Sequence, residues 1–395
     1  MPHFKYLILG GGMTADAAIN AIRRIDPAGP IGMISQEAFP PYKRPPLTKG
    51  LWKGKPVDSI WLKTDEQRLE QHLGVKVMSL DAKSKRLIDH TDTEYHFDKL
   101  LLATGGTPRR FLFENDDRVI YYRTFADYER LRSLADTGGR FLVVGGGFIG
   151  SEIAAALAMN GKQVTLVFPE DYIGAKLYPP DLGEFVNDYY RKQGVDVSPG
   201  ETVAKIDTSG DRIIVKLHGG RTLEVDGVVA GLGITPNTAL AEAAGLKVNN
   251  GIHVDDLLRT NHPDIYAAGD VAEFYNPALG KHLRVEHEDN AVTMGDYAGR
   301  SMAGQGRPYH YLPYFYSDLF DLGYEAVGEV DSTLHTFADW KEPSKEGVIY
   351  YLRENRIRGV LLWNVWDKVP AARELIASPV ERGEAELKGL IGVER

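Results

Sequence analysis

The stretches ILGGGMTA (Ile8–Ala15) and VVGGGFIG (Val143–Gly150) carry nearly the same glycine-rich pattern, well over a hundred residues apart. A turn of this kind between a strand and a helix lets the backbone approach the pyrophosphate of a dinucleotide, because the N-terminus of the helix faces the phosphates. Two such turns predict that one chain binds two dinucleotides.

The first turn lies in a complete strand–helix–strand unit. The apolar run Phe4–Leu9 predicts a buried strand, and an apolar helical face follows the turn. Gly10 permits the tight turn, Gly12 lets the backbone approach a pyrophosphate, and the small Ala15 lets the helix pack on the strand. Glu37 follows the second strand and can accept hydrogen bonds from a ribose. A glycine-rich connection without a ligand is the alternative, which the strand, helix and late acid together disfavour.

The second turn repeats this order. Its glycines are Gly145, Gly147 and Gly150. The flanking strands are Arg140–Val144 and Gln163–Phe168, and the helix between them is Ser151–Met159. Glu170 stands about as far from these glycines as Glu37 does from its own. An acid at this place suits the free 2′-hydroxyl of NADH and repels the 2′-phosphate of NADPH, and Lys176 is the basic residue nearby. We therefore expect NADH in preference to NADPH.

Composition and charge narrow the class of protein. The 395 residues are 43% hydrophobic and 26% charged, which is typical of a soluble globular protein of two or three domains. No apolar run is long enough to span a membrane. The N-terminus leads almost directly into a strand, so we expect no targeting segment and a cytoplasmic location. A net charge of −9 argues against bulk binding of nucleic acid.

The absence of cysteine decides between related redox reactions. With no cysteine in the chain, disulfides, Fe–S ligands, thiolate zinc sites and a dithiol relay are all excluded, and we expect no metal site. Two redox dinucleotides on one chain imply electron transfer between them. We interpret one as a bound flavin and the other as a nicotinamide that comes and goes.

Further segments carry a resemblance to a known family. The chain resembles the FAD- and NAD(P)-dependent pyridine nucleotide-disulfide reductase superfamily in the segments LLATGG (101–106), GLGITPN (231–237) and TNHPDIYAAGDVA (260–272). It is most similar to the ferredoxin reductase and apoptosis-inducing factor branch in FPEDYIGAK (168–176), PPYKRPPLTKGLW (40–52), VEHEDNAVTMG (285–295), YSDLFDLGYEAVG (316–328) and LLWNVWDKVPAARELI (361–376). The stretch RPPLTKG stands where the glutathione-reductase branch carries its cysteine pair.

The order of these motifs implies nested domains. We expect an α/β fold with two nested Rossmann-type nucleotide-binding domains of the three-layer ββα kind and a C-terminal α+β domain. The expected FAD-binding domain is discontinuous (1–112 and 240–310), the NAD-binding domain is 113–239, and the C-terminal interface domain is 311–395. In that last part we predict antiparallel strands with a hairpin turn at 353–356, a closing helix VPAARELIAS (369–378), and a mobile loop KEPSKEG (341–347).

The resemblance also implies catalytic residues. It places the Lys49 ammonium beside flavin N5, in an ion pair with Glu152, whereas a solvated loop lysine and a helix-dipole acid are the simpler interpretation of these two residues. Glu286 and His287 open a predicted helix; the resemblance puts Glu286 near the carboxamide of NAD and His287 near the flavin or nicotinamide ring. Hydride transfer to flavin requires no protein proton donor, so His287 need not be a general base.

Three other side chains have both a functional and a packing interpretation. Phe148 lies inside the second glycine turn and either gates the nicotinamide pocket or packs between strand and helix. Arg44 either meets the flavin pyrophosphate or lies on a surface loop. Tyr316 either lies against the isoalloxazine or belongs to the core.

The turns and the resemblance together predict which residues contact the two dinucleotides. The resemblance implies that Asp270 holds the ribityl chain of the flavin. On the FAD side the set is Gly10, Gly12, Ala15, Glu37, Arg44, Lys49, Val77, Ala103, Thr104, Gly105, Asp270, Glu286, His287 and Tyr316. On the NAD side it is Gly145, Gly147, Phe148, Ile149, Gly150, Glu152, Glu170, Lys176, Gly233 and Glu286.

Two functions remain open at this point. The first is an NADH-dependent FAD reductase that passes electrons to an external acceptor: a ferredoxin, a rubredoxin, a quinone or oxygen. The second resembles apoptosis-inducing factor: a redox-controlled interaction module with a long-lived complex of reduced FAD and NAD⁺ and NADH-linked dimerisation. A ferredoxin is usually acidic, so docking requires a local basic patch. Its candidates are Arg109, Arg110, Arg356, Arg358, Lys368 and Arg373.

Overall fold

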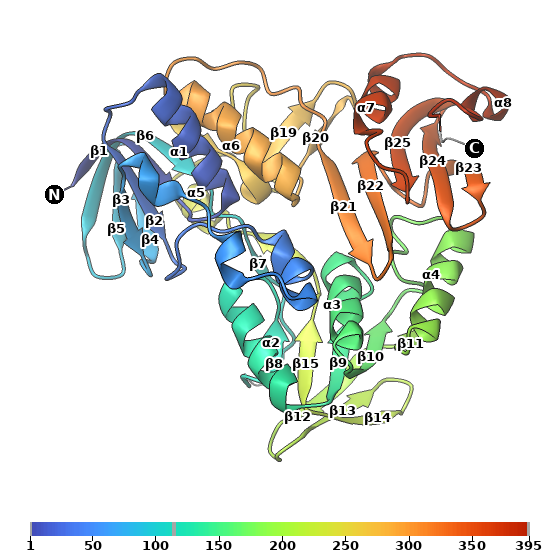
Figure 1. Ribbon diagram of the computed structural model, residues 1–395. Coiled ribbons are helices and arrows are strands. Elements are labelled where there is room, and N and C mark those ends of the chain that lie inside the picture. The colour runs from blue at the N-terminus through green and yellow to red at the C-terminus, as the bar shows by residue number, and fades with distance from the viewer. Residues whose placement is uncertain (1, 113–115, 393–395) are drawn as a thin grey trace. The chain divides into compact units, whose positions relative to one another are not determined.

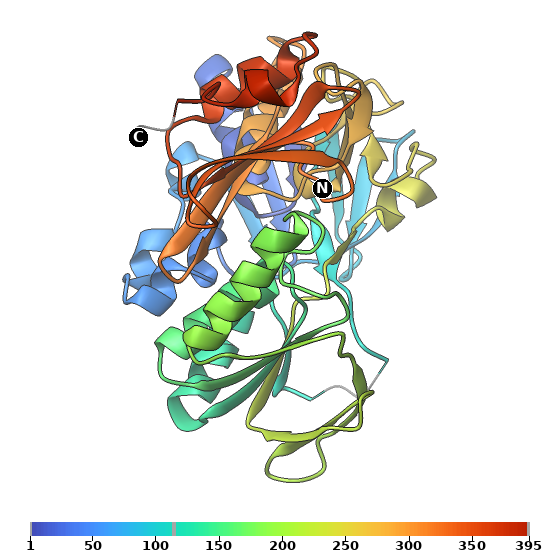
Figure 2. The same cartoon turned by 90° about the vertical axis from the view of Figure 1, so that its right-hand side faces the viewer.

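The computed structural model describes residues 2–112 and 116–392 and divides the chain into two compact units (Figures 1 and 2). Unit 1 consists of Met1–Lys43, Val57–Thr107 and Thr235–Tyr314. Unit 2 consists of Arg44–Pro56, Pro108–Ile234 and Phe315–Arg395. Each unit draws on three separate segments of the chain, so the nesting expected from the motif order is present, while the division into three domains stays a prediction.

Unit 1 is built on a sheet with the strand order β3-β2-β1-β6-β5-β4. Its strands are β1 (His3–Leu9), β2 (Ile31–Ser35), β3 (Glu70–Leu73), β4 (Val77–Asp81), β5 (Arg86–Asp89), β6 (Glu94–Leu102) and β18 (Ile265–Ala267). β1 runs parallel to β2 and β6, with Leu7 opposite Gly32 and Leu100. β6 pairs with β5 through its first residues and with β18 through its last, so this long strand joins the parallel and antiparallel parts of the sheet.

Two helices lie side by side in unit 1, α1 (Met13–Ile25) and α6 (Glu288–Met302), as Figure 1 shows. α1 buries Ala15, Ala18 and Ile22 at the spacing of one helical face. The two helices approach closely because α6 presents glycine to α1: a Cβ at Gly295 would lie 2.4 Å from the Thr14 carbonyl oxygen. This contact holds the helix of the first glycine turn in place.

Unit 2 contains an all-parallel sheet with the order β11-β10-β9-β15-β8. Its strands are β8 (Val119–Tyr121), β9 (Arg140–Val144), β10 (Gln163–Phe168), β11 (Asp196–Pro199) and β15 (Gly227–Ala230); its helices are α2 (Phe125–Thr137), α3 (Phe148–Met159) and α4 (Pro180–Lys192). A small antiparallel sheet follows, made of β12 (Val203–Asp207), β13 (Ile213–Leu217) and β14 (Thr222–Val225). The central strands β9 and β15 are almost wholly buried, as expected for a sheet covered on both faces, whereas the edge strand β11 buries only Val197.

The C-terminal segment of unit 2 forms an antiparallel sheet with the order β21-β22-β25-β24-β23, drawn in orange to red in Figure 2. The elements are β21 (Tyr314–Leu319), β22 (Leu322–Gly328), β23 (His335–Glu342), β24 (Glu346–Arg353), β25 (Arg356–Trp363), α7 (Val369–Ala377) and α8 (Glu384–Leu387). α7 packs against β22 and β25. Glu354 and Asn355 both adopt left-handed φ (51° and 59°) between the paired Arg353 and Arg356, which confirms the predicted hairpin turn.

The remaining elements of the described chain are short, and some of them pair into small sheets. They are η1 (Pro45–Leu47), η2 (Gly50–Lys53), η3 (Val57–Ile60), η4 (Thr64–Gln67), β7 (Gly106–Pro108), β16 (Ile234–Pro236), α5 (Ala239–Ala243), β17 (Ile252–His253), η5 (Gly269–Val271), β19 (Ala272–Asn276) and β20 (Lys281–Leu283). No helix in residues 2–112 or 116–392 is long and apolar enough to cross a bilayer.

Three local predictions are wrong in detail. The second helix begins at Phe148 and not at Ser151, because the glycine turn leads directly into the first helical turn. α6 begins at Glu288 with His287 as its N-cap, so Glu286 lies outside the helix. The segment 341–347 is a tight hairpin and not a mobile loop: β23 ends and β24 begins within it, and the Trp363 indole N–H donates to the Ser344 carbonyl oxygen at 3.0 Å.

Candidate functional site

The first glycine of each turn is required by the backbone. Gly10 has φ +131°, and a Cβ there would lie 2.2 Å from the Ala103 carbonyl oxygen. Gly145 has φ +113°, and a Cβ there would lie 2.4 Å from the Gly231 carbonyl oxygen. Both turns therefore need glycine for the same two reasons, left-handed backbone and close approach to a neighbouring strand end.

The second glycine of each turn has no such structural reason. Gly12 and Gly147 have φ −98° and −84°, which any residue adopts, and a Cβ at either position would meet no atom within 4 Å. Each residue is the N-cap of its helix, and neither helix has a side-chain cap. The missing side chain leaves open space at a helix N-terminus, where backbone N–H groups bind phosphate. These two positions therefore fit the pyrophosphate of a dinucleotide.

The third position differs between the turns. Ala15 is fully buried. At Gly150, by contrast, a Cβ would lie 1.8 Å from the Gly145 carbonyl oxygen. The second turn is therefore tighter than the first and tolerates no side chain at this place.

The two predicted ribose-binding acids have different surroundings. The Glu37 carboxylate accepts a hydrogen bond of 2.6 Å from the hydroxyl of the buried Tyr42. The Glu170 side chain has no hydrogen-bond or ion-pair partner within the described parts of the chain, and Lys176 is exposed. The hydrogen bond from Tyr42 thus fixes the position of the Glu37 carboxylate. Val77, predicted on the FAD side, is a buried residue of the unit 1 core.

Glu152 is the centre of a buried polar cluster in unit 2. Its Oε1 lies 2.6 Å from the Lys49 Nζ, and the two side chains are 5% and 13% exposed. The ion pair that the resemblance implies is therefore present in the structure. Burial of both charges excludes the simpler interpretation of a solvated lysine and an exposed dipole acid.

Two hydroxyls complete the hydrogen bonds of Glu152, and sequence reasoning missed both. The Thr48 Oγ1 donates to Glu152 Oε2 at 2.5 Å, and the Ser317 Oγ donates to Glu152 Oε1 at 2.6 Å. Thr48 is next to Lys49 in sequence, and this neighbourhood is only a weak indication that Thr48 belongs to the site. No pattern in the sequence connects Ser317 with Glu152, because the two residues lie 165 positions apart.

Three buried tyrosines surround this cluster. Burial raises the pKa of Tyr178, Tyr190 and Tyr324 far above the ordinary value, and the negative charge of Glu152 adds to the increase for all three. The Tyr178 and Tyr324 rings meet edge to face, with centroids 5.7 Å apart. The three phenols thus stay protonated beside the carboxylate.

Aromatic rings border the same cluster. The Phe148 ring meets the Phe315 ring edge to face, with centroids 5.3 Å apart. The Lys49 Nζ lies over the Tyr316 ring, 5.1 Å from its centroid. Phe148 therefore has a packing partner, in line with its packing interpretation, and Tyr316 lies beside the ion pair.

Hydrogen bonds join the loop that carries Lys49 to the rest of unit 2. The Tyr122 hydroxyl donates to the Leu47 carbonyl oxygen at 2.5 Å, and Asn160 Nδ2 donates to the Trp52 carbonyl oxygen at 3.1 Å. Arg44 donates to the Arg123 carbonyl oxygen at 3.0 Å. The segment 44–56, which the sequence assigns to the FAD-binding domain, thus packs with the unit that contains the second glycine turn.

On unit 1, one arginine connects two predicted site residues. Arg284 is 10% exposed, its Nη1 lies 2.6 Å from Glu286 Oε1, and it also donates to the Asp270 carbonyl oxygen at 3.1 Å. Sequence reasoning missed Arg284. The Thr104 hydroxyl donates to the Asn237 carbonyl oxygen at 3.0 Å, and Asn237 returns a bond of 2.8 Å to the Thr104 carbonyl oxygen.

The predicted site residues divide between the units. Unit 1 carries Gly10, Gly12, Ala15, Glu37, Val77, Ala103, Thr104, Gly105, Asp270, Glu286 and His287. Unit 2 carries Arg44, Lys49, Gly145, Gly147, Phe148, Ile149, Gly150, Glu152, Glu170, Lys176, Gly233 and Tyr316. The structure brings Lys49, Glu152 and Tyr316 together within unit 2.

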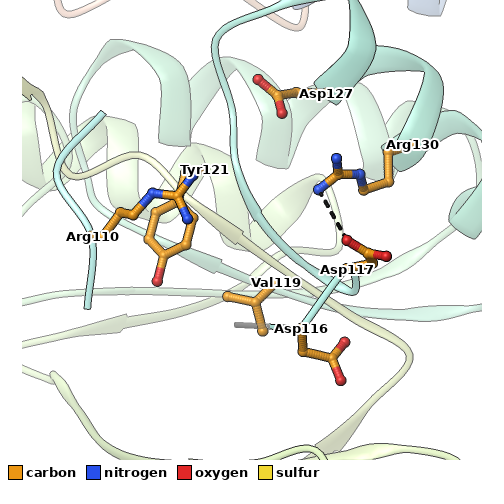
Figure 3. Close-up of a pocket in the computed structure, with 7 residues that line it drawn as sticks. All are labelled: Arg110, Asp116, Asp117, Val119, Tyr121, Asp127 and Arg130. Carbon is orange, nitrogen blue, oxygen red and sulfur yellow. Dashed lines mark ion pairs between the residues drawn. The ribbon is translucent and has the colours of Figure 1, made fainter. Parts of the chain in front are cut away.

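A separate cavity of about 350 Å³ opens beside β8 and α2 in unit 2 (Figure 3). Both arginines of its lining have partners there: Arg130 lies 3.7 Å from Asp117, and Arg110 lies over the Tyr121 ring at 4.8 Å. No residue of the predicted dinucleotide set lines it. Among the proposed docking cations, Arg358 pairs with Glu329 at 3.0 Å and is only partly available to a partner.

Comparison with protein families matches almost the whole chain. Residues 4–295 match the pyridine nucleotide-disulphide oxidoreductase family. Residues 298–346 and 341–378 match the C-terminal family of apoptosis-inducing factor.

Several characterised proteins are similar along most of their length. Apoptosis-inducing factor 1, mitochondrial, of Dictyostelium discoideum is 36% identical, over 94% of this chain and 78% of its own. The ferredoxin reductase subunit of 5,5'-dehydrodivanillate O-demethylase from Sphingobium sp. is 34% identical, over 90% and 89%. Monodehydroascorbate reductase 3 of Arabidopsis thaliana is 33% identical, over 91% and 89%.

A solved structure shares the fold. A chain in the covalent putidaredoxin reductase–putidaredoxin complex matches with a TM-score of 0.91 and 26% identity, over 99% of each chain. This match confirms the predicted fold class.

Proposed function

This chain belongs to the pyridine nucleotide-disulphide oxidoreductase family, and we propose that it is a reductase that takes a hydride from NADH into FAD and delivers the electrons to an external acceptor. FAD and NAD(P)H supply the redox chemistry of this family. The chain has no cysteine, so electrons leave the flavin without a dithiol relay. The preference for NADH rests on Glu170, whose carboxylate repels a 2′-phosphate.

The observation that carries the proposal is the open space at both glycine turns. A Cβ at Gly12 or Gly147 would meet no atom, although each glycine caps a helix. Packing therefore explains neither glycine, whereas two bound pyrophosphates explain both. We assign the turn of unit 1 to FAD and the turn of unit 2 to NADH.

The side chains then have distinct tasks. Glu37 holds the FAD ribose, Asp270 the ribityl chain, and Arg44 the pyrophosphate. Lys49 places a positive charge at the redox-active edge of the flavin, where it stabilises the electron-rich reduced ring. Glu152 pairs with that lysine and holds it in position.

Phe148 excludes water from the reacting rings on the nicotinamide side, and Tyr316 lies against the isoalloxazine on the flavin side. Glu286 holds the NAD carboxamide and His287 lies against a ring. The pairing of Glu286 with Arg284 supports this assignment, because it restricts the carboxylate to one position.

We propose a ferredoxin-type iron–sulfur protein as the acceptor. Support comes from the relative named as a ferredoxin reductase subunit and from the neighbour solved with putidaredoxin. A rubredoxin, a quinone, oxygen and the monodehydroascorbate radical are the other acceptors to be compared.

The second candidate is a redox-controlled interaction module like apoptosis-inducing factor. The match of residues 298–378 to the C-terminal family of that protein favours it, as does the relative from Dictyostelium discoideum. In this case reduction by NADH changes partner affinity or oligomeric state, and turnover is incidental. Homodimer formation and a cytoplasmic location both stay predictions, since the relatives include mitochondrial proteins.

One experiment separates these functions. The FAD-loaded protein is mixed anaerobically with NADH or NADPH, the flavin absorbance is recorded, and then ferredoxin, quinone or air is admitted. Rapid reduction by NADH followed by rapid transfer to ferredoxin supports the reductase. A reduced flavin that persists for many minutes in air, with a shift to dimer on size exclusion, supports the module. A protein that binds no FAD contradicts both.

A further inference from the structure

We propose that Thr48 and Ser317 are positioning residues, whose hydroxyls hold the Glu152 carboxylate so that Lys49 keeps one fixed place beside the flavin. This inference deepens the proposed function and rests on it. The two hydroxyls are called the hydroxyl pair below.

The hydroxyl pair and Lys49 together restrain both carboxylate oxygens of Glu152. Oε1 accepts from Lys49 and Ser317 at 2.6 Å each, and Oε2 accepts from Thr48 at 2.5 Å. Oxygen–oxygen distances this short are typical of hydroxyls that donate to an ionised carboxylate. Rotation of the carboxylate would break at least one of these bonds, so the group has a single favoured orientation.

Burial makes these bonds costly to lose. Thr48 is 6% exposed, Ser317 is fully buried, and Glu152 is 5% exposed. Water does not replace a missing donor at such a place, and an ionised group that lacks a partner is strongly disfavoured. Loss of either hydroxyl therefore leaves a buried carboxylate oxygen with one donor fewer and lets the carboxylate turn away.

The hydroxyl pair also joins three separate segments of unit 2. Thr48 ends η1, Glu152 lies in the first turns of α3, and Ser317 lies in β21. The lysine therefore does not depend on one flexible ion pair for its position.

The lysine responds to any movement of this carboxylate. Its Nζ has Glu152 on one side and the Tyr316 ring 5.1 Å away on another. A shift of Glu152 changes the distance between the ammonium and the flavin edge. A displacement of this kind slows the reaction more than it weakens NADH binding, because positioning acts mainly in the transition state.

The test uses FAD-loaded protein and four variants. Thr48→Val keeps the shape and removes the hydroxyl, Ser317→Ala removes the other hydroxyl, and Thr48→Ser is the conservative rescue. Thr260→Val is the matched control, since Thr260 is 8% exposed and its hydroxyl donates to the Ile265 carbonyl oxygen in unit 1. Stopped-flow reduction by NADH gives the limiting rate and the apparent Kd, and dye equilibration gives the flavin midpoint potential.

We expect Thr48→Val and Ser317→Ala to lower the limiting rate about tenfold, as the loss of a hydrogen bond to a charged group predicts. The apparent Kd for NADH should change less than about twofold, and the midpoint potential should become more negative. Thr48→Ser should restore both quantities, and Thr260→Val should leave them at the parental values while lowering the Tm.

Parental rates and potentials in both Thr48→Val and Ser317→Ala would overturn the inference and leave the proposed function intact. Parent protein that NADH does not reduce would instead contradict the proposed function itself. If Ser317→Ala fails to fold, Thr48→Val together with Thr48→Ser still decides the matter.

Discussion

The first and second glycine turns have similar backbone conformations, but the helices that follow them carry different side chains. Five residues after the open glycine, α1 has Ala17 and α3 has Glu152. Ala17 lies against Gly295 of α6, where a Cβ on that glycine would be only 3.0 Å away. Glu152 instead meets Lys49, Thr48 and Ser317.

This difference shows how one motif serves two tasks. In unit 1 the helix after the turn is a packing surface, and a side chain larger than alanine would separate α1 from α6. In unit 2 the same helical position supplies a buried charge. In the proposed function, the glycines give both turns a dinucleotide site, and the residue five positions after the open glycine decides which turn takes part in the chemistry.

The largest expected effect comes from the third position of the turns. Gly150→Ala places a Cβ 1.8 Å from the Gly145 carbonyl oxygen, so we expect the free energy of unfolding to fall by more than about 3 kcal/mol. The reciprocal change Ala15→Gly should cost only about 1 kcal/mol, from helix propensity. Urea denaturation of both variants measures this. Equal losses would show that the two turns are equally tight.

The next effect concerns the buried charge. Glu152→Gln keeps the shape but leaves Lys49, 13% exposed, without its counter-charge. We expect the limiting rate of flavin reduction by NADH to fall about 100-fold. The exposed Glu129→Gln on α2 is the control and should match the parent. An unchanged rate in Glu152→Gln would remove the ion pair from the site.

A third test addresses the open glycines. Gly12→Ala should weaken FAD retention, and Gly147→Ala should weaken NADH binding with FAD retained, each about tenfold. The free energy of unfolding of the cofactor-free protein should change by less than about 1 kcal/mol, because neither Cβ meets an atom. Titration calorimetry and denaturation measure the two quantities. Destabilisation without any loss of binding would mean that the glycines serve packing.

The smallest expected effect is on the pH dependence of stability, through a buried carboxyl group of unit 1. Burial alone would raise the pKa of Asp89, but hydrogen bonds from Thr91, Tyr95 and Thr93 lower it to about 2. A carboxyl with a lowered pKa stabilises unit 1 at neutral pH, and this contribution fades as the pH falls from about 4 to about 2. Asp89→Asn should therefore be less stable by about 1 kcal/mol at pH 7. Thermal melts should show the gap between variant and parent closing towards pH 2; a constant gap contradicts the assignment.

Much of the fold was predictable because it depends on local rules. The strands Arg140–Val144 and Gln163–Phe168 have the expected bounds. Left-handed backbone at Gly10 and Gly145 follows from the turn itself. Helix starts were less accurate, because Phe148 and His287 lie where a turn passes into a helix without a clear capping signal.

The candidate site was only partly predictable. Lys49 and Glu152 entered through the resemblance, and no pattern in the sequence pairs them. Thr48, Ser317 and Arg284 were missed because serine, threonine and arginine are common and their role depends on what they face. The membership of the segment 44–56 in unit 2 was also hidden, since its contacts with Tyr122 and Asn160 are remote in sequence.

The amino-acid sequence by itself predicted two phosphate-binding turns and two ribose-binding acids, and its lack of cysteine excluded thiol chemistry. Each of these depends on residue type and on spacing within one strand–helix–strand unit. Only the tertiary structure decided which carboxylate is buried and what holds it, because Glu152 meets Thr48 across 104 residues and Ser317 across 165. The chemistry of the carboxylate is set by the low dielectric and by the donors around it, and these exist only once distant segments have packed.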